Sequence, residues 1–125
     1  MPRTRTLAAT VALSATALLA GAGAASADTY TTQPLDPGAS FCVSQWASYQ
    51  VRGEGTATGG GARFKLLRNG VVLDATTGRV GSWVGERRTS YGNFPGAGTY
   101  SACAYNTGTT RTTVFLRIRT DGEFS

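Results

Sequence analysis

Apolar and polar side chains alternate with a period of two along most of the chain after residue 28. The clearest case is the segment RTTVFLRIR, in which Val114, Leu116 and Ile118 alternate with Phe115 and with polar residues. No segment of useful length has the 3.6-residue period of an amphipathic helix. Because successive side chains of a strand point to opposite faces of a sheet, the pattern predicts an all-β protein.

The segment FKLLRNGVVLDA contains the strongest local signal in the chain. Asn69 and Gly70 suit a type I′ hairpin turn, in which both central residues have positive φ. A regular hairpin around this turn predicts that Lys65 faces Asp74, as an opposite-charge pair between neighbouring strands. The order of the strands between Asp74 and Phe94 stays open at this point.

Residues 1–27 have the pattern of a secretory signal peptide. Arg3 and Arg5 precede an apolar run, LAATVALSATALLAGAG, and small residues stand before the expected cleavage point. The alternative is a retained membrane anchor. Cleavage would leave 98 residues, enough for one domain with one modest core and no membrane contact. We divide this secreted chain into three parts: an N-terminal arm at 28–40, a β-sandwich domain at 41–119 and a C-terminal tail at 120–125.

The chain contains two cysteines, Cys42 and Cys103, both after the expected cleavage point. Thiol pairs of exported proteins are normally oxidised, so we expect one disulfide bond between them. In the chain-entropy model, closing a loop of about 60 residues stabilises a fold by about 4 kcal/mol. A tight loop of two or four residues between the last two strands would place Cys103 on the same face as Val114 and Leu116, in the core.

The segment FCVSQWASYQVR, residues 41–52, has side chains suited to burial on both of its faces. Cys42 and Trp46 share one face, and we expect Trp46 to pack against the disulfide. A β-bulge that switches faces along one strand would bury both sets of side chains. The glycine-rich segment 53–61 is either a plain linker or a mobile binding loop.

The charge is mildly basic. After cleavage, ten basic residues face seven acidic ones, which gives a net charge of +3. Proteins that bind nucleic acid usually concentrate basic charge beside groove-reading or base-stacking motifs, and no such motif is present. We therefore expect no nucleic-acid partner. The modest charge and the lack of a cationic amphipathic helix also disfavour an antimicrobial factor.

Cys42 on an early strand, an internal hairpin, and Cys103 within GTYSACAYN together resemble an immunoglobulin-like β-sandwich. The resemblance covers about residues 41–119 and implies about seven strands and one disulfide that joins the two sheets across the core. The resemblance is imperfect at two residues. Tyr100 lies three residues before the second cysteine, whereas the tyrosine of the family lies two before it. Trp46 lies on the same strand as the first cysteine, whereas the core tryptophan of the family lies on the following strand. The export signal and the alanine, glycine and threonine bias resemble small secreted actinomycete proteins.

The composition argues against catalysis. The chain has no histidine, so it cannot form a Ser-His-Asp or Cys-His arrangement. Glu54, Asp74 and Glu86 are scattered over expected loops and strand ends, unlike the paired carboxylates of a glycosidase. Neither a CxxC motif nor a P-loop, GxSxG or calcium-loop pattern is present. We therefore expect no enzyme, no cofactor and no metal site.

The candidate binding residues are aromatic and arginine side chains that alternation places outside the core. Phe115, Arg117 and Arg119 share the outer face of the last strand, and Tyr100 should lie on that side of the strand beside it. The alternative is that Phe115 is an isolated surface aromatic. Trp83, which has glycines on its own face, either stacks on a sugar ring or fills the core.

These features favour a secreted, non-catalytic binding module that contacts a cell-wall polymer, another polysaccharide or an exported protein. The alternative is an inhibitor of a secreted hydrolase, either a protease or a glycosidase. In that case an exposed loop at 85–90, which carries Glu86, Arg87 and Arg88, would block the active site. Small size and a disulfide suit both hypotheses.

Overall fold

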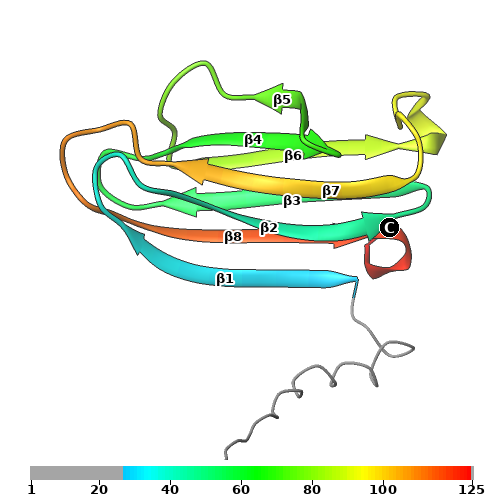
Figure 1. The fold of residues 1–125 in the computed structure, drawn as a ribbon, viewed down its shortest axis with the longest axis horizontal. Coiled ribbons are helices and arrows are strands. Elements are labelled where there is room, and N and C mark those ends of the chain that lie inside the picture. The colour runs from blue at the N-terminus through cyan, green and yellow to red at the C-terminus, as the bar shows by residue number, and fades with distance from the viewer. Residues whose placement is uncertain (1–26, 125) are drawn as a thin grey trace, which may run out of the picture.

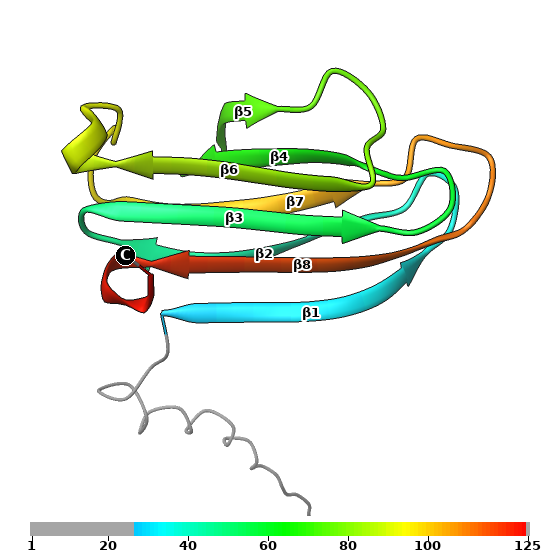
Figure 2. The same ribbon diagram turned by 180° about the vertical axis from the view of Figure 1, so that it is seen from behind.

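The computed structural model describes residues 27–124, which form two packed four-stranded antiparallel sheets (Figure 1; Figure 2 shows the opposite side). The first sheet has the order β1-β8-β3-β6 and the second the order β2-β7-β4-β5. The strands are β1 (Asp28–Leu35), β2 (Ser40–Ala47), β3 (Gln50–Ala57), β4 (Arg63–Arg68), β5 (Val71–Ala75), β6 (Ser82–Arg88), β7 (Gly98–Tyr105) and β8 (Thr112–Thr120). The prediction of an all-β sandwich with one disulfide is confirmed.

The two ends of the domain belong to the sandwich. β1 pairs with β8 along its whole length, so the segment expected as an arm at 28–40 supplies an edge strand of the first sheet. Of the expected tail at 120–125, Thr120 is the last residue of β8, Asp121–Glu123 form a 3₁₀ turn and Phe124 is buried, while Ser125 lies outside the described residues. The expected signal peptide, apart from Ala27, lies outside the described residues. No helical segment within residues 27–124 is long and apolar enough to span a membrane.

The core lies between the two sheets and is built from alternate residues of their strands. β8 contributes Val114, Leu116 and Ile118, as predicted, and none of the three has exposed surface. The second sheet contributes the fully buried Phe64 of β4 and Tyr100 of β7. This period of two leaves the other side of each strand free to face outward.

Trp83 of β6 lies in this core and stacks on Phe64 of the opposite sheet, with 5.5 Å between the ring centroids and 2° between the ring planes. Glycines make room for the two rings. A Cβ atom on Gly55 would lie only 2.4 Å from the Phe64 ring. One on Gly85 would lie 2.6 Å from the Trp83 ring. The first half of the expected 53–61 loop is therefore the end of β3, whose glycines receive aromatic rings.

The segment 41–52 forms two strands, β2 and β3, rather than one bulged strand. β2 belongs to the second sheet and β3 to the first, so the chain crosses between sheets at Ser48 and Tyr49. The Asp121 carboxylate accepts the backbone N–H of both residues at 2.9 Å. Only one of the two faces enters the core: Val43, Ala47 and Val51 are buried, whereas Trp46 on the other face is 58% exposed. The expectation that both faces are buried is therefore wrong.

The hairpin between β4 and β5 contains the predicted turn, with φ of 48° at Asn69 and 85° at Gly70. The expected pairing of Lys65 with Asp74 is wrong, because a bulge shifts the register and Lys65 faces Ala75. The bulge inserts one extra residue on the β5 side of the ladder.

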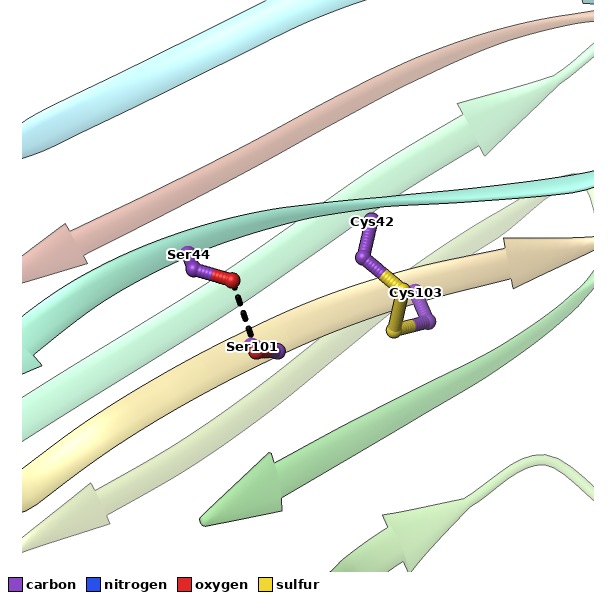
Figure 3. The surroundings of a disulfide bond; sticks show 4 residues. All are labelled: Cys42, Ser44, Ser101 and Cys103. Atoms are coloured by element: carbon purple, nitrogen blue, oxygen red, sulfur yellow. Dashed lines mark hydrogen bonds between the residues drawn. A yellow bond between two sulfur atoms is a disulfide. The ribbon is translucent and has the colours of Figure 1, made fainter. Parts of the chain in front are cut away.

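Cys42 and Cys103 form the predicted disulfide, but in an unexpected place. They face each other on the neighbouring strands β2 and β7, so the bond staples one sheet (Figure 3). On the same outer side, the hydroxyl oxygens of Ser44 and Ser101 are 2.7 Å apart. The expected bond across the core is wrong, because β7 and β8 belong to different sheets and do not form a tight hairpin.

Candidate functional site

The outer surface of the first sheet carries Phe115, Arg117 and Arg119 side by side on β8, as alternation predicts. β1 borders β8 on one side, and β3 and β6 extend the sheet on the other. We call this surface the arginine face. Its main outward side chains are Tyr30, Arg52, Glu54, Val84, Glu86, Arg88, Phe115, Arg117 and Arg119.

Arg117 is held on this face by a bidentate ion pair with Asp28 of β1, the edge strand. Its Nε and Nη2 atoms donate to the two carboxylate oxygens at 2.9 and 2.6 Å. The hydrogen bond from Arg117 lowers the pKa of Asp28, and the same bond raises the pKa of Arg117. The guanidinium also lies 5.5 Å from the centroid of the Tyr30 ring, within the range of a cation–π contact. Arg117 is therefore fixed in direction.

A chain of ion pairs continues from β8 across β3 to β6. Arg119 Nη2 and Arg52 Nε both donate to Oε1 of Glu54, at 2.9 and 3.0 Å. Arg52 Nη1 also reaches Glu86 at 3.3 Å, and Glu86 accepts from Arg88. Burial acts to raise the pKa of Glu54, but the hydrogen bonds from Arg119 and Arg52 outweigh it, so the pKa is lowered. These side chains hold one another in place and leave little rotamer freedom to lose on binding.

An open depression of about 280 Å³ lies beside these ion pairs. Val84, which is 52% exposed, and Phe115 line it together with Arg52 and Glu54. Trp83 also contributes to the lining, although it is only 9% exposed and belongs to the core. Of the two predicted alternatives for Trp83, stacking on a sugar ring or filling the core, the second describes its position. An apolar hollow beside arginine side chains is the type of surface found at the centre of protein interfaces.

Two aromatic residues lie on the opposite side from the one predicted. Tyr100, expected on the outer surface, is fully buried, and its hydroxyl donates to the carbonyl of Gly96 at 2.6 Å. Burial raises the pKa of this hydroxyl. Trp46, expected in the core beside the disulfide, is 58% exposed. Both corrections have one cause, since β2 and β7 present their cysteine-bearing sides outward.

The segment at 85–90, expected as a loop that blocks an active site, is mostly strand. Glu86, Arg87 and Arg88 belong to β6, which pairs with β3. The side chains of Glu86 and Arg88 are engaged in the ion-pair chain of the arginine face. Arg87 donates instead to the backbone carbonyl of Leu73 at 2.9 Å. The prediction of a free inhibitory loop is wrong.

Three exposed aromatic residues that the alternation did not single out as binding residues gather at one end of the sandwich. Trp46 is near the end of β2, Tyr49 follows it in the bend before β3, and Tyr91 lies in the 3₁₀ turn after β6; they are 58, 47 and 63% exposed. Thr89 ties the two turns together, because its N–H and its hydroxyl both donate to the Tyr49 carbonyl, at 3.0 and 2.7 Å. We call these residues the aromatic end.

The sequence matches no family model and no curated protein. Among solved structures, the fold is similar to that of Aeromonas hydrophila PliG, a periplasmic lysozyme inhibitor of g-type lysozyme. The TM-score is 0.51 and the identity 13%, over 74% of this chain and 84% of that chain. At this identity the likeness shows a shared sandwich fold.

Proposed function

We propose that this chain is an exported, non-catalytic protein that binds another exported protein through the arginine face. We further propose that the partner is a polysaccharide-cleaving hydrolase of the lysozyme class, which the chain inhibits. The observation that carries this proposal is the apolar depression at Val84 and Phe115, set beside arginines that are already fixed by ion pairs. The fold shared with a lysozyme inhibitor supports the choice of partner.

The form of the depression favours a protein partner over a small molecule. It is open to solvent, so a small ligand would keep much of its surface in water, whereas a protruding side chain of a flat partner surface would fill it. Aromatic residues and arginine are enriched at the centre of protein interfaces. Tyr30 and Val84 are 62 and 52% exposed, and a docked partner would remove both from water.

Two carboxylates at the arginine face, Asp28 and Glu54, are unsuited to act as the general acid of glycoside hydrolysis. A glycosidase needs one carboxyl group whose pKa is raised, so that it can act as a general acid. Asp28 and Glu54 instead have lowered pKa values, because each accepts hydrogen bonds from arginine. Their role is to hold the guanidinium groups, which agrees with a binding function.

An inhibition assay with matched variants tests this proposal. Cell-wall lysis by a goose-type lysozyme, a chicken-type lysozyme and an unrelated protease would be measured against rising concentrations of the oxidised protein. We expect saturable inhibition of a lysozyme. Val84→Arg fills the depression with a long cation and should weaken inhibition at least about tenfold, because the added charge must be desolvated in the complex.

Val72→Arg is the control, because Val72 is similarly exposed, at 48%, but lies on β5 of the other sheet. We expect this variant to change the inhibition constant less than about twofold, within the usual range of surface substitutions. Inhibition of no hydrolase, or an equal loss in both variants, would count against the proposal.

A second candidate function, glycan binding, rests on the aromatic end. Trp46, Tyr49 and Tyr91 are exposed aromatic residues of the kind that stack on sugar rings, and the Arg88 guanidinium lies over the Tyr91 ring, 5.3 Å from its centroid. Co-sedimentation with insoluble polysaccharides and cell walls tests it, with a bystander protein of equal charge as reference. Depletion that Trp46→Ala abolishes would support this function. Absence of depletion, or depletion that survives the substitution, would reject the site.

A further inference from the structure

A smaller pocket of about 130 Å³ lies on the second sheet, away from the arginine face. It is lined by Arg63 and Lys65 of β4, by Tyr105 of β7 and by Thr107. Arg63 faces Tyr105 across the β4–β7 ladder, and Lys65, two residues further, projects on the same side. The strand register therefore brings two cations to one hollow that is large enough for a small oxyanion.

The cations of this pocket have no acidic partner within the described part of the chain. None of the ion pairs there includes Arg63 or Lys65. The Lys65 Nζ atom lies 4.7 Å from the centroid of the Tyr105 ring, so it is kept at the pocket by a cation–π contact.

The Arg63 guanidinium is held in place by one hydrogen bond and has further N–H groups that can donate to a ligand. Its Nη2 atom donates to the carbonyl of Thr76 at 2.9 Å, which holds the guanidinium in place. Its Nε atom is buried and finds no hydrogen-bond acceptor among residues 27–124. The protein itself covers this atom, so the Arg63 donors that remain for an anion in the pocket are those of Nη1 and the second N–H of Nη2.

We propose that this pocket binds a phosphate group. A guanidinium offers a planar fork of donors and an ammonium a compact charge, and the two together match an oxyanion with several oxygens. Two cations without an acidic partner favour the doubly charged phosphate over a singly charged carboxylate. Because the pocket opens to the outside, the phosphate can be a free ion or part of a phosphate ester.

The test is a ¹H–¹⁵N NMR titration of the oxidised protein with sodium phosphate and, separately, with glycerol 3-phosphate, at ionic strength held constant with chloride. We expect saturable shifts at the amides of Arg63, Lys65 and Tyr105, with dissociation constants in the millimolar range. Tighter binding of glycerol 3-phosphate would assign the site to phosphate esters, and tighter binding of inorganic phosphate to the free ion.

Lys65→Gln should weaken binding at least about fivefold, because it removes one charged contact. The Lys65 side chain makes no hydrogen bond to the described residues, so the variant should fold, which its thermal midpoint would verify. Arg111→Gln is the control, because it removes the same charge from an exposed pair with Asp36. Shifts no larger than those with chloride, or equal weakening in both variants, would overturn the proposal. No hydrolase enters this test, so its result is independent of the inhibition assay.

Discussion

Replacing Gly55 by alanine should destabilise the sandwich through the ring stack in its core. A Cβ atom there would lie 2.4 Å from Cε1 and 2.9 Å from Cδ1 of Phe64. The ring cannot easily move aside, because it is fully buried and stacked on Trp83 at 5.5 Å. The added methyl group must displace a close-packed pair of rings, and overpacking of this kind costs about 1–3 kcal/mol. For a domain of this size, that loss would lower the melting temperature by about 5–20 °C.

Gly81→Ala is the matched control for this prediction. A Cβ atom on Gly81 would meet nothing closer than the carbonyl oxygen of Ala57 at 3.8 Å, which is an ordinary contact. This substitution should be neutral or stabilise the fold by up to about 1 kcal/mol, through the unfolded state. Urea denaturation of both oxidised variants measures the difference. A free energy of unfolding for Gly55→Ala within about 0.5 kcal/mol of the parent would refute the close approach of ring and backbone.

Three further predictions concern the bonds that hold the domain. Replacing Cys42 and Cys103 by serine should lower the free energy of unfolding by about 4 kcal/mol, the loop-closure term for a separation of 61 residues, and an unchanged urea midpoint would contradict this. Arg117 lowers the pKa of Asp28 from its ordinary value of 3.8, so their pair stabilises the fold above that pH, and the benefit disappears as the pH falls through the lowered value. Arg117→Gln should therefore lower the urea midpoint at pH 7 and much less at pH 2; an equal loss at both would contradict the assignment. Asp121→Ala leaves three backbone N–H groups of the β2–β3 bend without their acceptor and should cost about 2 kcal/mol, which the same denaturation measurement can reject.

The local features of the fold could be predicted because they depend on residues close in the chain. The turn at Asn69 and Gly70 follows from the conformational freedom of these two residue types. The buried side of β8 follows from strict alternation of apolar and polar residues. The disulfide pairing follows from the presence of two cysteines alone.

The positions of Cys103 and Tyr100 could not be predicted, because they depend on strand partners far apart in the chain. Alternation correctly places the two residues on opposite sides of β7. Which side is inward depends on the sheet that holds the strand, and β7 lies between β2 and β4 rather than beside β8. The expected hairpin between β7 and β8 therefore places the Cys103 side of β7 inward and the Tyr100 side outward, which is the reverse of their orientation in the structure.

The candidate site was predictable only in its β8 part. Phe115, Arg117 and Arg119 follow from alternation, whereas Tyr30 and Val84 join them only through the strand order β1-β8-β3-β6. Neither residue stands in a recognisable motif, so no local pattern indicates that they share one face. The depression likewise depends on three strands that come together from distant segments.

The most direct test of the central proposal is to map where a hydrolase contacts the protein. The ¹⁵N-labelled protein would be titrated with unlabelled goose-type lysozyme, and amide shifts or broadening would be recorded. We predict that the affected outward residues surround Phe115 on β3, β6 and β8, and that the effect is lost with Val84→Arg. Binding that affects only the second sheet or the aromatic end, or no binding by any lysozyme tested, would contradict the account.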